Sequence, residues 1–136
     1  MKTIRVVAAV ISRTENGKME ILATQRGYGD YKDSWEFPGG KIEPGETAED
    51  ALVREIQEEL QVRIAIDSFL QTVEYEYPKF HLCMDCFMCH IDEGELVLTE
   101  HEAAKWLDLE HLADLDWLPS DLEVIDNLKE NYSLQK

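Results

Sequence analysis

The stretch from Gly39 to Val62 constrains this chain more than any other, and it reads GGKIEPGETAEDALVREIQEELQV. A glycine pair and a Pro-Gly turn lead into an acidic segment with helical periodicity. Thr47 and Asp50 stand three residues apart, as in a capping box that satisfies free N–H groups at a helix start. An apolar stripe recurs every four residues, at Ala48, Leu52, Ile56 and Leu60. The sequence therefore predicts an amphipathic helix behind a glycine-rich loop.

The same helix carries Glu55, Glu58 and Glu59 at i, i+3 and i+4, which gathers three carboxylates on one face. Like charges at this spacing repel each other, so we expect a cation there. Clustered carboxylates with a loop carbonyl nearby suit a hard divalent ion, Mg²⁺ or Mn²⁺. Arg54 can pair with Glu58 one turn further on, and the glycine pair lets the backbone approach a ligand closely. A solvated acidic helix face is the alternative, and the three carboxylates alone do not decide between the two.

The wider spacing favours the metal site. Gly40, then Glu46 after five residues and Arg54-Glu55 after seven more, begin a longer pattern that ends at Val62. This stretch resembles the Nudix box, G-x5-E-x7-R-E-U-x-E-E-x-G-U, where U is apolar. Every position matches except one, because Gln61 stands where the box has Gly. If the backbone is left-handed there, Gln costs about 1 kcal/mol relative to Gly.

Further segments are similar to the small MutT-type nucleoside triphosphate pyrophosphohydrolases of the Nudix family, including their CTP pyrophosphohydrolase-like branch. They are Trp35-Glu36-Phe37-Pro38-Gly39-Gly40, Tyr75-Glu76-Tyr77-Pro78, Glu100 placed six before Trp106, and Pro119-Ser120-Asp121. The resemblance implies hydrolysis of a (deoxy)nucleoside triphosphate to the monophosphate and pyrophosphate, with water attacking the β-phosphorus. It also implies a housecleaning role, for cytosine nucleotides or for oxidised purine nucleotides such as 8-oxo-dGTP.

The box positions suggest a role for each residue. We expect Mg²⁺, or Mn²⁺ as a substitute, to be held by the Gly40 carbonyl, Glu55, Glu58, Glu59 and Glu100. The predicted catalytic residues are Arg54, Glu55, Glu58 and Glu100. Arg54 would orient carboxylates, and Glu55 is the expected general base, ahead of Glu100. Glu46 is expected to be a structural partner of the loop.

The predicted substrate-binding residues are Arg26, Trp35, Glu36, Phe37, Gly39 and Asp121. Asp121 is the expected reader of the nucleobase, and an ionised Asp can only accept hydrogen bonds. Cytosine and guanine both offer donors, so Asp121 does not decide between them, although the resemblance leans towards cytosine. Alternatively, Asp121 only complements a helix N-terminus.

The length and the net charge limit the number of domains and the kinds of partner. The 136 residues suffice for one domain, 1–136, and the net charge of −16 argues against binding long DNA or RNA. The N-terminal MKTIRVVAAV lacks a signal-peptide pattern and no apolar run has membrane-spanning length, so we expect a cytoplasmic protein. Its expected partner is a small nucleotide, with no nucleic acid polymer and no membrane, and it would be a monomer or a homodimer.

The remaining pattern predicts an α+β fold, and the resemblance implies a Nudix-type α/β/α sandwich around a mixed sheet with a central loop-helix-loop motif. Strands are expected at Ile4–Ser12, whose β-branched and Ala content suits burial on both faces, and at Met19–Gln25, His81–Ile91 and Lys105–Leu107, with a hairpin turn at Asn16-Gly17. Val62–Tyr77 is expected to be a long strand or a bent pair of strands. A short helix is expected at Leu109–Leu115. Ser120 and Glu123 form a second capping box that opens a helix over Asp121–Lys129, with Leu122, Ile125 or Val124, and Leu128 as its apolar stripe.

Cys83, Cys86 and Cys89 have the C-x2-C-x2-C spacing of some metal sites. They lie in a predicted strand, where Cys86 would face away from the other two, so buried free thiols are the better interpretation. Trp106 and Trp117 are expected in the core, and Trp35 at the border of the site. The histidines show no metal-ligand spacing, and none is assigned a catalytic role.

Three functions remain open from the sequence. The first is (d)NTP pyrophosphohydrolysis. The second is a Nudix hydrolase of another diphosphate, such as ADP-ribose or a dinucleoside polyphosphate. The third is a nucleotide sensor without catalysis, against which the intact set of Arg54, Glu55, Glu58 and Glu59 argues.

Overall fold

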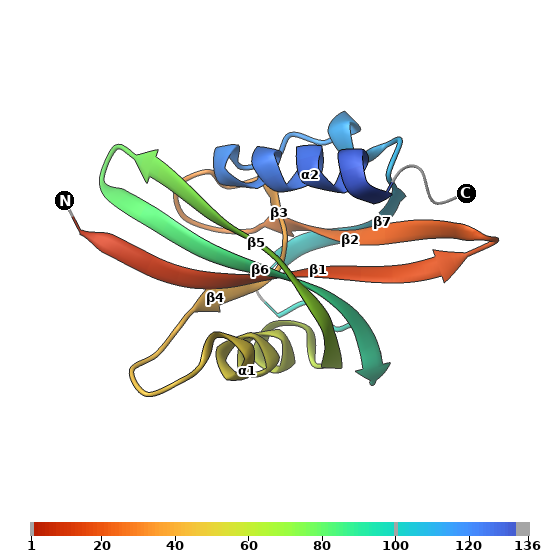
Figure 1. Cartoon of the computed structure of the whole chain (residues 1–136), viewed down its shortest axis with the longest axis horizontal. Helices are drawn as coiled ribbons and strands as arrows, with labels where there is room; N and C mark the ends of the chain where they lie inside the picture. Colours follow the sequence, from red (N-terminus) through yellow and green to blue (C-terminus); the bar gives the residue numbers. More distant parts are fainter. Residues whose placement is uncertain (1, 100, 133–136) are drawn as a thin grey trace.

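The computed structural model describes residues 2–99 and 101–132 and shows a mixed β-sheet between two helices (Figure 1). Helix α1 (Ala48–Leu60) covers one face of the sheet and α2 (Leu122–Tyr132) the other. The strands are β1 (Thr3–Glu15), β2 (Lys18–Arg26), β3 (Trp35–Glu36), β4 (Gly39–Lys41), β5 (Arg63–Tyr77), β6 (Phe80–Glu93) and β7 (His101–Asp108). This arrangement confirms the predicted α/β/α sandwich. Neither helix in the described ranges is long and apolar enough to cross a membrane.

Strand β1 is the centre of the sheet. The strand order is β3-β2-β1-β6-β5, with β4 paired to β1 and β7 paired to β2. Only the β1–β6 pairing is parallel among these ladders, which makes the sheet mixed. The predicted hairpin at Asn16-Gly17 is confirmed, because both residues have positive φ and Glu15 faces Lys18 across the turn.

Side chains of β1 alternate between two hydrophobic cores, one on each face of the sheet. Val7, Ala9 and Ile11 pack with Leu52, Ile56 and Leu60 of α1. Ala8 and Val10 pack on the opposite face, with a cluster that includes Val124, Ile125 and Leu128 of α2. The β-branched and small residues of β1 thus bury both of its faces, as the sequence predicted for this strand.

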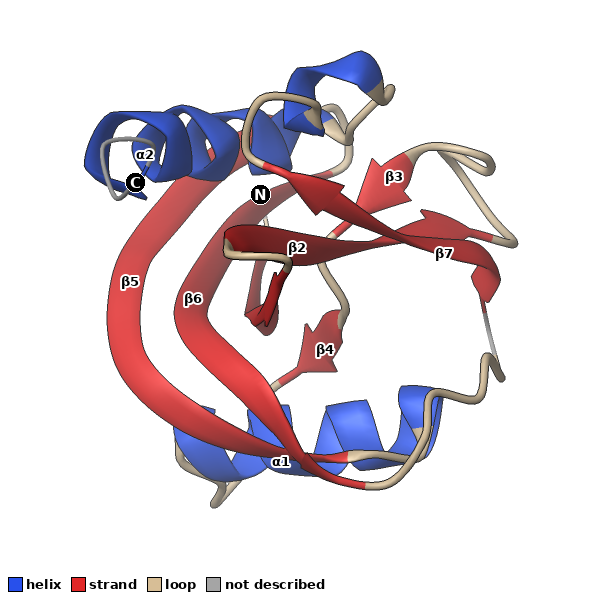
Figure 2. Cartoon of the chain, turned by 90° about the vertical axis from the view of Figure 1, so that its right-hand side faces the viewer, coloured by secondary structure: helices blue, strands red, loops and turns tan. Residues whose placement is uncertain are grey.

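Strands β5 and β6 form a long hairpin that curves strongly across the sheet (Figure 2). The register shifts at three places along β5, and such bulges bend a strand and increase its twist. The curved hairpin brings Phe80, at the start of β6, to the same end of the sheet as the N-terminal part of β1, since Thr3 faces His81. The structure therefore has one long, bent strand, β5, where the sequence predicted a long strand or a bent pair over 62–77.

Helix α1 begins and ends as its sequence indicates. The Thr47 side chain accepts a hydrogen bond from the Asp50 backbone N–H at 3.1 Å. At the other end Gln61 is left-handed, with φ 58° and ψ 32°, and its N–H donates to the Gln57 carbonyl. The position that departs from the Nudix box therefore carries the backbone strain that glycine would avoid.

Three predicted local structures were wrong. Gly39–Lys41 is a short strand rather than a loop, because these residues pair with Val6–Ala8 of β1. The predicted helix over Leu109–Leu115 is only a 3₁₀ turn at Leu112–Asp114. Leu122 does not belong to the apolar stripe of α2, since it is 51% exposed.

The predicted capping box at Ser120 was also wrong. A 3₁₀ turn, Pro119–Asp121, precedes α2, and the buried Ser120 hydroxyl accepts a hydrogen bond from the Tyr77 hydroxyl at 2.8 Å. The Ser120 N–H also donates to the Tyr77 oxygen. A tertiary contact with the end of β5 therefore engages the serine that the local pattern assigned to the helix.

The cysteines lie on β6 as predicted, and all three are free thiols. Cys86 packs in the core below α2 and Cys89 in the core above α1, which confirms that they face opposite sides of the sheet. Burial raises the pKa of both thiols, that of Cys89 to about 12. These thiols are therefore protonated at neutral pH and pack as small apolar groups.

Candidate active site

A cleft of about 520 Å³ opens between β1, β6 and the C-terminal half of α1. One wall is apolar and consists of Ile4 and Val6 of β1 with Phe80 and Leu82 of β6. A second, polar wall contains Arg26, Tyr28, Glu36 and His101. Gly39, Gly40, Lys41, Glu43, Glu55, Glu58 and Glu59 line the remaining side. The volume lies in the range of small-ligand pockets, and an apolar wall beside acidic groups suits a ligand with a flat ring and a charged tail.

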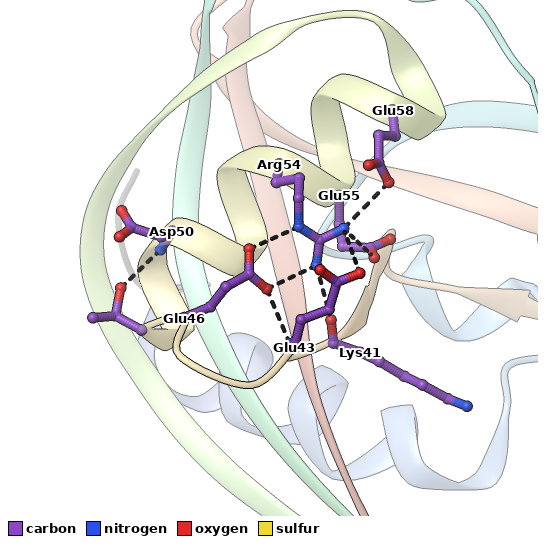
Figure 3. Close-up of polar contacts among 8 residues, drawn as sticks. Lys41, Glu43, Glu46, Asp50, Arg54, Glu55 and Glu58 are labelled. Carbon is purple, nitrogen blue, oxygen red and sulfur yellow. Dashed lines mark hydrogen bonds and ion pairs between the residues drawn. The ribbon is translucent and has the colours of Figure 1, made fainter.

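Arg54 organises the acidic side (Figure 3). Its Nε and Nη2 donate to the two oxygens of Glu46 at 2.7 and 2.9 Å, a bidentate contact. Its Nη1 donates to both Glu55, at 2.9 Å, and Glu58, at 3.2 Å. The predicted i,i+4 pair with Glu58 is thus present, but Glu46 makes the shorter contacts.

Glu46 closes the loop before α1. Besides binding Arg54, its carboxylate accepts a hydrogen bond from the Glu43 N–H at 3.0 Å. The hydrogen bonds from the Arg54 guanidinium, followed by that from Glu43, lower the pKa of Glu46 to about 2. Hydrogen bonding to Glu46 likewise raises the pKa of Arg54 above its usual range. Glu46 is therefore ionised at any physiological pH and keeps Arg54 oriented towards the neighbouring carboxylates.

The glycine pair is needed for close approach, as the sequence suggested. A Cβ at Gly39 would overlap the Val7 carbonyl of the adjoining strand. A Cβ at Gly40 would overlap the carboxylate of Glu55. Strand β4 and helix α1 can therefore bring the Gly40 backbone against the Glu55 carboxylate only because position 40 has no side chain.

These residues fit a hard divalent cation. Glu55, Glu58 and Glu59 all line the same side of the cleft, and the Gly40 backbone lies against Glu55, so these four candidate ligands all offer hard oxygen atoms. Within the described ranges, no three His, Cys, Asp or Glu side chains already stand as a ready metal site. Arg54 Nη1 instead draws Glu55 and Glu58 together, and Glu58 is 60% exposed and can swing towards a ligand.

The segment that leads to β7 is fixed on the end of α1. Thr99 donates its hydroxyl to the carbonyls of Glu58 and Glu59, at 3.2 and 2.9 Å, and its N–H to Glu59. Glu100, the further predicted ligand, lies outside the described residues. Thr99, which precedes Glu100 in the chain, is attached to the helix that carries the carboxylates, and the role of Glu100 stays a prediction.

The residues predicted to bind the substrate are only partly brought together. Glu36 and Arg26 line the cleft, whereas Trp35 and Phe37 are buried in the core towards α2. Asp121 is also buried, and its Oδ2 accepts a hydrogen bond from the Phe37 N–H at 3.0 Å. Backbone bonds between Trp35 and the segment 116–118 hold the Asp121 turn beside β3. Asp121 thus lies directly behind the polar wall of the cleft.

Burial gives Asp121 an unusual acidity. Desolvation is the main cause that raises its pKa to about 7, and the charge of Glu36 adds to it. Hydrogen bonds from Phe37 and Ser120 and the charge of Arg26 act in the opposite direction. Near neutral pH the carboxyl is therefore present in both forms, and the protonated form can donate a hydrogen bond as well as accept one.

The sequence did not indicate several residues of the cleft, namely Ile4, Val6, Tyr28, Phe80, Leu82 and His101. Ile4 and Val6 gave a weak signal, since they alternate with Val7 and Ala9 on a strand predicted to be buried on both faces. Phe80 follows the Tyr-Pro turn, which the family resemblance covered only up to Pro78. For Tyr28 and His101 the local sequence gave no signal.

Comparison with known proteins agrees with this geometry. The sequence profile of the NUDIX domain matches residues 2–128. An 8-oxo-dGTP diphosphatase of Escherichia coli (strain K12) is 37% identical over 130 residues, which is 95% of this chain and 98% of that protein. A CTP pyrophosphohydrolase of the same strain is 32% identical over 126 residues, covering 93% and 91% of the two chains.

A solved structure also resembles this chain over its full length. The solution structure of the E. coli ORF135 protein matches with a TM-score of 0.79 and 29% identity, covering 100% of this chain and 96% of that one. The fold, the carboxylates that Arg54 contacts and the two relatives all indicate the same family. This chain belongs to the NUDIX family of hydrolases.

Proposed function

We propose that this protein is a divalent-metal-dependent nucleoside triphosphate pyrophosphohydrolase that converts a (d)NTP and water to the (d)NMP and pyrophosphate. Nudix hydrolases generally need a divalent metal. The observation that carries the proposal is the cleft itself, where Arg54-bound carboxylates face the Gly39-Gly40 backbone beside an apolar wall. That arrangement matches a triphosphate at the acidic end and a nucleobase at the apolar end.

The glutamates at the acidic end of the cleft and the triphosphate are both negatively charged, so binding there requires a neutralising cation. Among the described residues, five glutamates and two basic side chains, Arg26 and Lys41, line the cleft, and the whole chain has a net charge of −16. A divalent cation, Mg²⁺ or Mn²⁺, would neutralise phosphate charge there and raise the electrophilicity of the phosphorus. The Gly40 carbonyl with Glu55, Glu58 and Glu59 would hold it, with Glu100 as a further ligand.

The remaining chemistry falls to the side chains. Water attacks the β-phosphorus, the bond from that phosphorus to the α–β bridging oxygen breaks, and the nucleoside monophosphate leaves with that oxygen. Glu55 accepts the proton of the attacking water, with Glu100 as the second choice. Arg54 orients the carboxylates of Glu55 and Glu58 through its shared Nη1.

The base end supports cytosine and oxidised guanine nucleotides as substrates. The two curated relatives act, by their names, on 8-oxo-dGTP and on CTP. Glu36 can accept from the exocyclic amine of either base. Asp121, with a pKa raised to about 7, can accept when ionised and donate when protonated, but it is buried and would reach the base only if the 119–121 turn moves. We further propose a housecleaning role in the cytoplasm for the monomer or homodimer.

Product analysis over a panel of nucleotides tests this proposal. The panel is CTP, dCTP, 5-methyl-dCTP, dGTP, 8-oxo-dGTP, ADP-ribose and diadenosine tetraphosphate, each with Mg²⁺. We expect monophosphate plus pyrophosphate, and the highest kcat/KM for a cytosine nucleotide or 8-oxo-dGTP. AMP with ribose phosphate as the best reaction would show a hydrolase of a diphosphate derivative instead. Tight binding without turnover would show a nucleotide sensor.

A further inference from the structure

Three neighbouring strands bring Arg26, Glu36 and His101 together at the polar wall of the cleft. Strand β2 lies between the other two: β3 pairs Glu36 with Thr24, and β7 pairs His101 with Arg26 itself. Arg26 Nε lies 3.4 Å from one oxygen of Glu36, and His101 Nε2 lies 3.5 Å from the other. The carboxylate is thus held between two nitrogen donors on opposite sides.

The cluster is partly buried and incompletely hydrogen-bonded. The His101 side chain is only 4% exposed, and the exposed fraction of Glu36 is 17%. Both contacts to Glu36 are longer than well-formed charge-assisted hydrogen bonds. Among the residues that the structure describes, Arg26 Nε and His101 Nδ1 are buried atoms with no hydrogen-bond partner. Buried polar groups of proteins are nearly always satisfied, and such contacts are often long until a ligand tightens them.

We propose that His101 is a positioning residue for base recognition, holding the Glu36 carboxylate in place to accept hydrogen bonds from the nucleobase. This inference rests on the proposed function, because it requires a nucleotide in the cleft. With Nε2 donating to Glu36, His101 fixes the oxygen that Arg26 does not reach. His101 thereby connects the segment after Glu100 to the base end of the cleft.

Two substitutions separate positioning from mere packing. His101→Ala removes the donor, and His101→Gln keeps an amide N–H that can replace Nε2. His90→Ala is the matched control, since His90 is exposed and pairs with Asp67 through Nδ1 at 2.8 Å. Calorimetry measures binding of the products dCMP, 8-oxo-dGMP and dTMP without metal, and steady-state kinetics with Mg²⁺ give kcat and KM for the triphosphates.

We expect His101→Ala to weaken binding of the preferred monophosphate about tenfold or more, and by unequal factors for the three nucleotides. KM should rise similarly while kcat changes less than about threefold. His101→Gln should restore binding to within about threefold of wild type, and His90→Ala should match wild type. Equal losses for all three nucleotides, no rescue by Gln, or His101→Ala binding like His90→Ala would overturn the inference.

The same data separate this inference from the proposed function. Turnover of triphosphates by the wild type, with no effect of His101→Ala, overturns the inference alone. Base-dependent binding changes in a wild type that releases no pyrophosphate overturn the proposed reaction and leave the inference standing. A wild type that binds no nucleotide overturns both.

Discussion

Replacing Asp121 with Asn should change how the stability of the protein depends on pH. Asp121 is 2% exposed, and its Oδ2 accepts a hydrogen bond from the Phe37 N–H. Asn has nearly the same size and keeps an oxygen that can accept this bond, but it cannot ionise. The substitution therefore removes the titration of one buried carboxyl while the surrounding packing is retained.

The raised pKa sets the expected magnitude. Burial raises the pKa of Asp121 from the ordinary 3.8 to about 7, so the folded protein holds this proton more tightly than the unfolded chain. The contribution of Asp121 to stability is then largest below about pH 4 and falls as the pH rises to about 7. At 1.36 kcal/mol per pH unit, ionising the buried carboxyl costs on the order of 4 kcal/mol above pH 7. The Asn variant avoids this cost.

Urea unfolding followed by tryptophan fluorescence, on both proteins at pH 4, 5, 6, 7 and 8, measures the effect. The stability of Asp121→Asn relative to wild type should increase with pH between about 4 and about 7 and then level off. The difference between the two proteins cancels the titration of groups that they share. A difference that stays constant over this range would refute a raised pKa at Asp121, and one that decreases with pH would show a lowered one.

Three further substitutions test the site and its helix. Glu58→Gln should lower turnover by several orders of magnitude and leave the fold intact, because the cleft loses a carboxylate charge but little volume. Arg54→Lys cannot reproduce the bidentate contact with Glu46 and should lower turnover roughly 10- to 100-fold. Its acid unfolding should also begin at higher pH, since the lowered pKa of Glu46 stabilises the fold above about 4.5 and is lost towards about 2. Gln61→Gly should raise stability by about 1 kcal/mol, because φ is 58° there.

Each of these has a control or a contradicting result. Glu49→Gln changes an exposed glutamate of the same helix and should keep full activity. A folded Glu58→Gln enzyme with near wild-type turnover at saturating Mg²⁺ would exclude this face as the metal site. Unchanged acid unfolding in Arg54→Lys would show that Glu46 does not depend on the guanidinium. A lower melting temperature in Gln61→Gly would show that another contact favours Gln.

The parts of the fold that the sequence predicted are those set by local chemistry. Helix α1 was predictable because its four-residue stripe, the Thr47 cap and the box spacing all agree. The β1–β2 hairpin was predictable because Asn16-Gly17 can adopt two positive φ values in a row. The carboxylate face followed directly from helical periodicity, and the structure adds that Arg54 contacts Glu46 as well as its helical neighbours.

The errors occurred where tertiary contacts decide the local structure. Ser120 binds the Tyr77 hydroxyl, 43 residues away, and this contact replaces the cap that its sequence spacing indicated. The Gly39–Lys41 segment becomes a strand only because β1 offers it an edge. His101 enters the cleft cluster through pairing of β2 with β7, and no local pattern reports which strands will be neighbours.

Attack of water on the β-phosphorus, with release of pyrophosphate, can be measured directly. The protein hydrolyses the best nucleoside triphosphate in H₂¹⁸O with Mg²⁺, and ³¹P NMR with mass spectrometry identifies the products and locates the label. We expect nucleoside monophosphate and pyrophosphate, with ¹⁸O in the pyrophosphate and no turnover when EDTA replaces Mg²⁺. Label in the monophosphate, release of nucleoside diphosphate and orthophosphate, or equal turnover in EDTA would contradict the proposed reaction.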